Sequence, residues 1–466
     1  MKKNILKTAI LFFLIGIILS SCKNTQTNNQ EKNTKHDSIT KIENMLERTK
    51  KSNIYEVNIR QYTPEGTFKA FQEKHLDRLH EMGVDILWLM PVQPIGEKNR
   101  KGEMGSYYSV KDYIGVNPEF GTEQDFQNLV DAVHERGMLL IIDWVANHSA
   151  WDNPWITEHP DWYVKDSTGA IIAPVPDWTD VADLNYDNQD MRNEMIKSLK
   201  FWVETYDIDG FRCDVAGMVP TSFWNEARTE LNKGRPIFML AEANDEDLME
   251  MAFDMNYNWD SHHLMNDIAK GEKNAGNMRG YIETPPRHFN ENTYRMVFTS
   301  NHDENSWNGT VFERMPNSYK TWAVFSFVVP GMPLIYSGQE AMLDRRLKFF
   351  DKDEIDWKDY PLQDFYTKLI TLKNENKALW NGKFGGEIHF INTSNGEQTI
   401  TFKRTKDDNT ILVEMNLSNR EATFNYMEKD VEQTYTEYFT GEKTTRKPHE
   451  NYTLAPWEYK VLILDK

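Results

Sequence analysis

Short apolar runs alternate with amphipathic stretches along most of the chain. Seven apolar runs have the length and composition of buried strands, at 54–59, 85–91, 138–144, 208–214, 236–242, 295–301 and 332–338. A weaker eighth run lies at 252–256, and helical spacing is clearest at 67–82, 123–137, 195–206 and 222–232. Strands separated by helices indicate parallel βα units. Eight units within about 330 residues predict an α/β protein with a (β/α)8 TIM barrel, formed by 51–143 and 188–380.

Two regions depart from this alternation. Residues 144–187 are rich in Pro, Trp and Asp. A connection this long inside a compact domain is usually functional, so we expect an inserted domain after the third strand. Residues 381–466 contain short apolar runs separated by polar turns. They predict a C-terminal antiparallel β-sandwich.

The N-terminus has the pattern of an export signal. A basic start, MKKNILK, precedes an apolar run of 13 residues, TAILFFLIGIILS. That run is short for a membrane span and suits a signal core. The run leads into LSSC at 19–22, which resembles a bacterial lipobox. Residues 1–21 are therefore predicted to be removed, and Cys22 is predicted to carry lipid. The alternative is an ordinary signal peptide with a chance Cys.

The segment after the predicted cleavage site lacks aliphatic residues from Lys23 to Asp37. It cannot build a core, and residues 22–50 are predicted to form a disordered tether. The residue after Cys22 is Lys, which favours an exported lipoprotein of the outer membrane over retention at the inner membrane. Cys213 would be the one cysteine left unmodified, so no disulfide within the chain is expected.

The formal net charge of the chain is −19. A strongly negative surface repels phosphate backbones, which argues against nucleic acid as a partner. It does not disfavour a neutral polymer such as a polysaccharide.

Polar side chains gather at the ends of four predicted strands. The carboxyl ends of barrel strands meet at one mouth, so these residues are expected to line one cavity. They are Asp143, Asn147 and His148 after the third strand, Arg212 and Asp214 on the fourth, Glu242 on the fifth, and His302 and Asp303 on the seventh. An adjacent cation lowers the pKa of a carboxylate, so Arg212 is expected to keep Asp214 ionised.

The motifs at these strand ends resemble those of the α-amylase family, glycoside hydrolase family 13. Four short motifs follow in order: DWVANH at 143–148, GFRCDVA at 210–216, LAE at 240–242 and SNHD at 300–303. DLN at 183–185 falls in the predicted insert, as in many members. The segments GSYYSVKDY and PGMPLIYSGQE are similar to the family's chain after strand two and at strand eight.

The resemblance implies roles for the residues of the predicted cavity. Asp214 would be the nucleophile, Glu242 the general acid and then base, and Asp303 a third acid that binds the sugar in the transition state. His148 and His302 would donate hydrogen bonds to sugar hydroxyls, with Arg212 beside the nucleophile. Tyr108 matches the tyrosine that stacks under that sugar, with Tyr107 as the neighbouring candidate.

The resemblance also implies a calcium ion between barrel and insert. Asn147 and Asp183 match the family's side-chain ligands, and a main-chain carbonyl near Met218 would be a third, since calcium prefers oxygen ligands. The alternative is that these residues hold the insert by hydrogen bonds alone.

The function implied is retaining hydrolysis of α-1,4-glucosidic bonds in starch, maltodextrins or related α-glucans. Where many amylases have Lys-His after the nucleophile, this chain has Gly217 and Met218. A cyclomaltodextrinase- or neopullulanase-like hydrolase, or a glucan transglycosylase, is therefore the close alternative. A sugar-binding lipoprotein without activity is the alternative from another class, disfavoured because all three acids are present.

Overall fold

The computed structural model describes residues 45–465. The predicted signal peptide, the lipidation site Cys22 and most of the predicted tether lie outside the described residues. The end of the tether prediction is wrong, because residues 45–49 are helical. A compact unit begins at Thr49, whose carbonyl accepts a hydrogen bond from the Asn381 side chain (2.9 Å). Among the residues described, no helix has the length and apolarity needed to cross a membrane.

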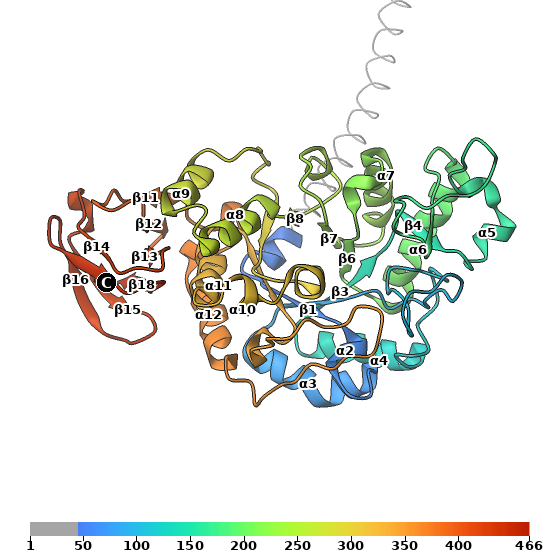
Figure 1. The fold of residues 1–466 in the computed structure, drawn as a ribbon, viewed down its shortest axis with the longest axis horizontal. Coiled ribbons are helices and arrows are strands. Elements are labelled where there is room, and N and C mark those ends of the chain that lie inside the picture. The colour runs from blue at the N-terminus through green and yellow to red at the C-terminus, as the bar shows by residue number, and fades with distance from the viewer. Residues whose placement is uncertain (1–44, 466) are drawn as a thin grey trace, which may run out of the picture. The chain divides into compact units, whose positions relative to one another are not determined.

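Eight parallel strands close into a barrel, and helices surround it (Figure 1). Around the barrel the order is β1-β10-β9-β8-β7-β6-β3-β2. The strands are β1 (Ile54–Val57), β2 (Ile86–Leu89), β3 (Leu139–Trp144), β6 (Gly210–Cys213), β7 (Phe238–Ala241), β8 (Met255–Tyr257), β9 (Tyr294–Val297) and β10 (Met332–Tyr336). All eight correspond to predicted runs, so the predicted TIM barrel is confirmed.

The helices of the barrel follow its strands in the chain. They are α2 (Ile59–Tyr62), α3 (Phe68–Met82), α4 (Glu123–Glu135), α6 (Gln189–Tyr206), α7 (Thr221–Leu231), α8 (Trp259–Lys270), α9 (Ala275–Glu283), α10 (Val311–Arg314), α11 (Tyr319–Val328) and α12 (Gln363–Glu375). Local sequence sets several of their ends. Thr122 and Asp125 form a capping box at the start of α4, and Gly83 ends α3 in the left-handed conformation, where glycine has no steric penalty.

The predicted first strand was drawn two residues too long. Strand β1 ends at Val57, and Ile59 already belongs to the short helix α2. Ile59 is buried in this helix, so its apolar character signals burial and does not mark a strand.

The insert after β3 contains little regular structure. It pairs β4 (His148–Ala150) with β5 (Val181–Asp183) as an antiparallel ladder, and it also holds α5 (Trp155–Glu158) and the 3₁₀ turn η1 (Pro160–Trp162). The ladder places His148 opposite Asp183. It therefore ties the far end of the insert to the residues that leave β3.

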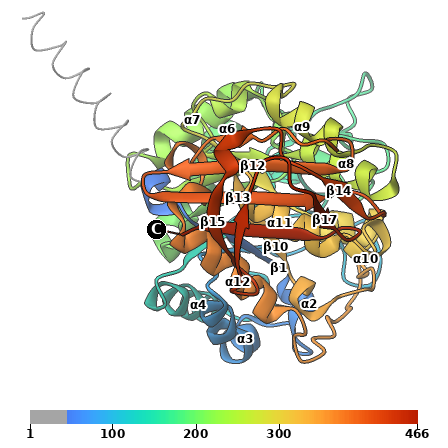
Figure 2. The same ribbon diagram turned by 90° about the vertical axis from the view of Figure 1, so that its left-hand side faces the viewer.

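The C-terminal region forms two antiparallel sheets, and Figure 2 shows strands β12, β13 and β15 of the larger one. The six-stranded sheet has the order β11-β12-β13-β18-β15-β16, with β11 (Ile388–Phe390), β12 (Thr399–Lys406), β13 (Asn409–Asn416), β15 (Gln433–Glu437), β16 (Lys443–Arg446) and β18 (Tyr459–Leu464). Strands β14 (Ala422–Phe424) and β17 (Tyr452–Leu454) form the small sheet. Leu412, Phe424, Leu454 and Leu462 share one buried cluster, so apolar side chains from both sheets pack together, as in a sandwich.

Candidate active site

A cavity of about 660 Å³ opens at the carboxyl ends of the barrel strands. Its lining comes from the ends of barrel strands, the loop after β2, the insert and the loop after β10. The lining includes Tyr108, His148, Trp178, Asp214, Glu242, Asp303, Trp307 and Phe349. The sequence-predicted acids Asp214, Glu242 and Asp303 therefore do reach one cavity.

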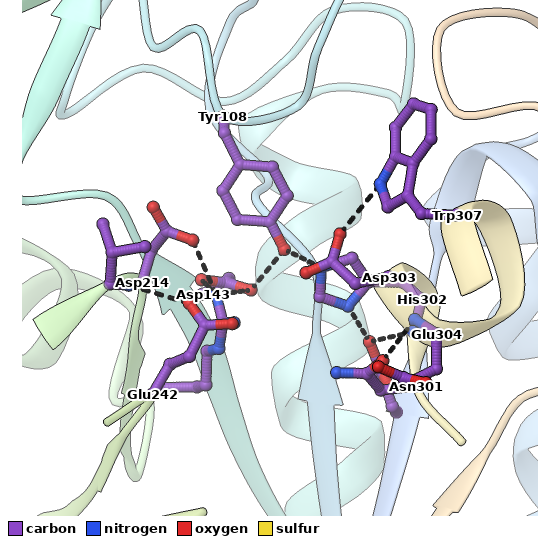
Figure 3. Close-up of polar contacts among 12 residues, drawn as sticks. Tyr108, Asp143, Asp214, Glu242, Asn301, His302, Asp303, Glu304 and Trp307 are labelled. Carbon is purple, nitrogen blue, oxygen red and sulfur yellow. Dashed lines mark hydrogen bonds and ion pairs between the residues drawn. The ribbon is translucent and has the colours of Figure 1, made fainter. Parts of the chain in front are cut away.

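One guanidinium organises three carboxyl groups beneath this cavity (Figure 3 labels the carboxyl side chains). Arg212 Nη1 lies 2.9 Å from Asp143 Oδ1 and 3.1 Å from Asp214 Oδ1, and Nη2 lies 2.8 Å from Glu242 Oε1. Arg212 is fully buried, and its Nε donates to the Tyr257 hydroxyl (3.2 Å). Asp214 and Glu242 are thus fixed on neighbouring nitrogens of the same planar group.

Strand register explains how the sequence brings these groups together. Asp143 of β3 is the register partner of Arg212 in β6, so their side chains leave the sheet side by side. Strand β6 approaches β7 closely, and a Cβ at Gly210 would lie 1.9 Å from the Phe238 carbonyl oxygen. Glycine is therefore required at the start of the strand that carries Arg212 and Asp214.

The protonation of the cluster differs from the sequence expectation. Burial raises the pKa of Asp214 well above its ordinary value, the Glu242 carboxylate raises it further, and Arg212 lowers it without prevailing. Burial likewise raises the pKa of Asp143 to about 6. Three carboxyl groups share one guanidinium, so desolvation and mutual repulsion favour retention of a proton within the cluster. The expectation that Arg212 alone keeps Asp214 ionised considered only one of these effects.

The residue after Asp214 has an unusual backbone conformation. Val215 has φ 36° and ψ 46°, a left-handed conformation that is rare for a β-branched residue. In this conformation the Val215 N–H donates to Glu242 Oε2 (2.8 Å). The strained peptide thus links the chain at one acid to the carboxyl group of the other.

His302 lies between three acceptors inside the barrel (Figure 3). Its Nδ1 lies 2.5 Å from Glu56 Oε1, and its Nε2 lies 2.8 Å from the Tyr108 hydroxyl and 3.3 Å from Asp303 Oδ2. Burial opposes the charged imidazole, but the carboxylates of Asp303 and Glu56 outweigh it and raise the pKa of His302 well above its ordinary value. An imidazolium that donates from both nitrogens matches this geometry.

Tyr108 and His148 reach the cavity as predicted. The Tyr108 hydroxyl donates to Asp143 Oδ2 (3.0 Å), whereas the neighbouring Tyr107 is absent from the cavity lining and packs under Arg60. Burial lowers the pKa of His148 to about 4. His148 Nδ1 lies 3.2 Å from the Asn147 side-chain amide nitrogen, and the ring also has a hydrogen bond to the Tyr108 backbone.

The predicted calcium ligands lie where the insert leaves the barrel. The Asn147 carbonyl accepts a hydrogen bond from the N–H of Leu184 (3.2 Å), the residue after Asp183. Burial raises the pKa of Asp183 to about 6. Within residues 45–465, no group of three or more His, Cys, Asp or Glu side chains is placed to hold a metal. A cation here would need amide and main-chain oxygens besides Asp183, which are ligands that calcium accepts.

Several residues of the site were not predicted from the sequence, and four of them contact predicted site residues. Glu56 on β1, Trp178 in the insert, Trp307 after β9 and Phe349 after β10 all contact predicted site residues. A carboxylate within an apolar strand was a signal that could have identified Glu56, since an unpaired buried charge is costly. The three aromatic residues carried no signal, because the same residue types also fill the core.

The comparisons agree with this geometry. The model of the alpha-amylase catalytic domain matches residues 24–171 and 175–360. The chain belongs to the alpha-amylase family. Alpha-amylase MalA of Haloarcula japonica is 26% identical over 390 residues, which are 79% of this chain and 56% of that protein. A cyclomaltodextrinase of Bacillus sp is 27% identical over 374 residues, covering 73% of this chain and 64% of that protein. The matched part of the chain thus spans less than two thirds of the length of these two family members.

A solved structure shares the architecture of this alpha-amylase family member along most of its length. The noncanonic maltogenic alpha-amylase AmyB from Thermotoga neapolitana superposes with a TM-score of 0.82 at 28% identity. The match covers 90% of this chain and 100% of that chain. The barrel and the C-terminal antiparallel domain therefore follow a known arrangement of the family.

Proposed function

We propose that the protein is a retaining glycoside hydrolase that cleaves α-1,4-glucosidic bonds in starch, maltodextrins or related α-glucans. One observation carries the proposal: Arg212 holds Asp214 and Glu242 on adjacent nitrogens at the floor of a cavity that Asp303 also lines. Two carboxyl groups held close together are what a double-displacement mechanism requires.

Each acid has a distinct part in this mechanism. Asp214, as carboxylate, attacks the anomeric carbon while Glu242 protonates the glycosidic oxygen, so a covalent glycosyl-enzyme forms and the leaving chain departs. Glu242 then removes a proton from water, which attacks the same carbon and releases the α-anomer. The reaction needs the proton of the carboxyl cluster to reside on Glu242. Asp303 remains ionised, because His302 lowers its pKa, and it stabilises the positive charge on the sugar.

The activity is tested with maltoheptaose and soluble starch. The purified protein should release shorter oligosaccharides whose new ends are initially α by NMR, and D214N and E242Q should each lower kcat by at least about a thousandfold. D245N is the matched control, since Asp245 is an exposed carboxylate three residues beyond Glu242. Full activity in D214N would refute the assignment.

The close alternative is a cyclomaltodextrinase- or neopullulanase-like hydrolase or a glucan transglycosylase. The cyclomaltodextrinase among the relatives supports keeping it. So does Met218, which follows the nucleophile by four positions and is 46% exposed. Incubation with maltoheptaose, cyclodextrin and pullulan separates the alternatives, because products longer than maltoheptaose require transfer.

We also propose a calcium ion at Asn147 and Asp183, and a lipid anchor at Cys22 on an exported protein of the outer membrane. The half-buried Asp183 carboxylate supports the first, since a bound cation would favour its ionised form. The signal-like sequence before Cys22 supports the second. Mass spectrometry of the mature N-terminus tests the anchor: C22A should lack the lipid and leave the membrane fraction.

A further inference from the structure

Trp307 has a position that none of the roles above explains. It lies in a π-helical turn, η4 (Glu304–Asn308), directly after Asp303. Its indole N–H donates to Asp303 Oδ1 (3.1 Å), as Figure 3 shows. The side chain nevertheless remains 51% exposed and lines the cavity. Large aromatic side chains are usually buried in folded proteins, so an exposed one at a site rim needs a reason.

The turn that carries Trp307 is anchored on both sides. Asn301 Oδ1 accepts from the Glu304 N–H (2.8 Å), and Glu304 pairs with His262 (3.1 Å). Asn305 Oδ1 accepts from the N–H of Leu347 (2.9 Å). These contacts fix the turn to the barrel and to the loop after β10, so Trp307 is presented on a rigid base. Single π-helical turns occur frequently at functional sites.

Trp307, Phe349 and Tyr108 form an aromatic wall along the cavity. The ring of Phe349 lies 5.2 Å from the Trp307 ring and 6.1 Å from the Tyr108 ring, measured between centroids. Trp307 lies on the far side of Tyr108 from both Glu242 and Asp214 (Figure 3). Glu242 protonates the bond to the leaving chain under the proposed mechanism, so the leaving chain lies on its side of the cavity. Trp307 lies away from Glu242 and contacts Asp303, the acid that stabilises the charge on the sugar attached to Asp214. Its ring therefore faces the part of the substrate that stays on the nucleophile.

We propose that Trp307 positions Asp303 through its indole N–H and offers the exposed face of its ring to a glucosyl unit of the substrate. That unit is the neighbour, on the non-reducing side, of the sugar that becomes attached to Asp214. The inference rests on the proposed function and deepens it. Pyranose rings have faces of C–H groups, and these bury apolar area against an aromatic ring. The N–H and the face are separate features of one side chain, so substitution can remove them separately.

W307F keeps an aromatic face and removes the N–H. With maltoheptaose, kcat should fall about tenfold, because a hydrogen bond to a charged group is lost, while KM should change little. The same N–H lowers the pKa of Asp303. Since Asp303 acts as a carboxylate, the acidic limb of kcat/KM should move to higher pH.

W307L removes both features. Its kcat should fall as in W307F, and its KM for maltoheptaose should rise about fivefold because the platform is lost. W380F is the matched control, since the Trp380 indole donates to a backbone carbonyl (Asn374, 3.4 Å) outside the cavity. It should leave kcat, KM and the pH profile unchanged, and thermal unfolding of all variants shows whether each is folded.

The outcomes separate the two parts of the inference from the proposed function. An unchanged kcat and acidic limb in W307F would overturn the positioning role. A KM in W307L equal to that of W307F would overturn the platform. Wild-type protein that leaves maltoheptaose intact would instead refute the proposed function. An active wild type with equally active Trp307 variants would refute only the inference about Trp307.

Discussion

Glu56 and His302 form a buried ion pair at the base of the site, although 246 positions separate them in the chain. Glu56 Oε1 lies 2.5 Å from His302 Nδ1, and the Glu56 side chain is fully buried. Glu56 belongs to β1 and His302 follows β9, and β10 lies between these strands in the barrel. The contact therefore passes over β10 and fixes the ring whose other nitrogen contacts the cavity residues Tyr108 and Asp303. Removing the carboxylate tests its importance.

E56Q should change how activity depends on pH. The pKa of His302 is raised by Asp303 and Glu56, and loss of one of these carboxylates lowers it. The imidazolium would then lose its proton at lower pH, so the basic limb of kcat/KM for maltoheptaose should shift to lower pH. The free energy of unfolding should depend on pH in the same direction. Because the pKa of His302 is raised in the folded state, the stabilisation from its charged form is present below the unfolded-state pKa and is lost as pH rises through the folded-state pKa.

E340Q is the matched control for E56Q. Glu340 is also fully buried, but it pairs with Arg78 (3.0 Å) away from the cavity. It should lower the free energy of unfolding and leave the pH profile as in the wild type. A basic limb in E56Q that coincides with that of the wild type would show that Glu56 does not control the charge of His302.

R212K should nearly abolish activity while the protein still folds. Lysine is a compact charge without the planar fork, so it cannot hold Asp143, Asp214 and Glu242 together. We expect kcat to fall more than about a hundredfold and the free energy of unfolding to fall by about 3 kcal/mol, since buried carboxylates lose their partner. Urea unfolding and maltoheptaose kinetics measure both effects.

R228K controls for loss of a buried arginine. Arg228 pairs with Asp254 (2.8 Å) and is buried, but it does not line the cavity. A similar loss of stability with near-normal kcat is expected. If R212K and R228K lost activity equally, the effect of Arg212 would be structural.

V215G should separate stability from activity. Glycine adopts positive φ without strain, so removing Val215 from its left-handed conformation should raise the free energy of unfolding by about 1 kcal/mol. The more mobile peptide would hold its N–H less firmly toward Glu242, so kcat should fall. Thermal unfolding measures the change in stability, and maltoheptaose kinetics on the same preparation measure the change in kcat. A less stable V215G would mean that the packing of the valine side chain outweighs the strain.

Calcium should stabilise the wild type through Asp183. Burial raises the pKa of the Asp183 carboxyl group to about 6. At pH 7 the group is mostly ionised, so burying the charged form lowers the free energy of unfolding. A bound cation removes this cost. We expect added calcium to raise Tm of the metal-free wild type at pH 7, and chelation to reverse the change. D183N should not respond to calcium; an equal shift in both proteins would place any ion elsewhere.

Much of the fold followed from local sequence. Each barrel strand overlaps a short apolar run, and a polar residue follows β1, β6, β7, β8 and β10 directly. Several of the helices between the strands have clear apolar periodicity. Strands β15, β16 and β17 of the C-terminal region are polar and partly exposed, so they do not form apolar runs. Their pairing comes from backbone hydrogen bonds to neighbouring strands, which apolar periodicity does not record.

The candidate site was predicted in part for the same reason. Asp214, Glu242 and Asp303 stand at strand ends, where barrel geometry dictates a common location. Trp307 lies in the π-helical turn η4 and Phe349 in the loop after β10, and the course of both segments depends on anchors such as the hydrogen bond between Asn305 and Leu347. No periodicity in the sequence fixes that course, so their place at the cavity could not be predicted.

The sequence by itself determined the barrel, the insert and the set of acids at the barrel mouth, because strand order and strand ends follow from the spacing of apolar runs. Only the tertiary structure decided which groups share Arg212, which residue holds His302, and how burial sets the proton balance among the carboxyl groups. Those properties depend on distances of a few ångströms between distant segments and on the exclusion of water, and both arise only when the chain has packed.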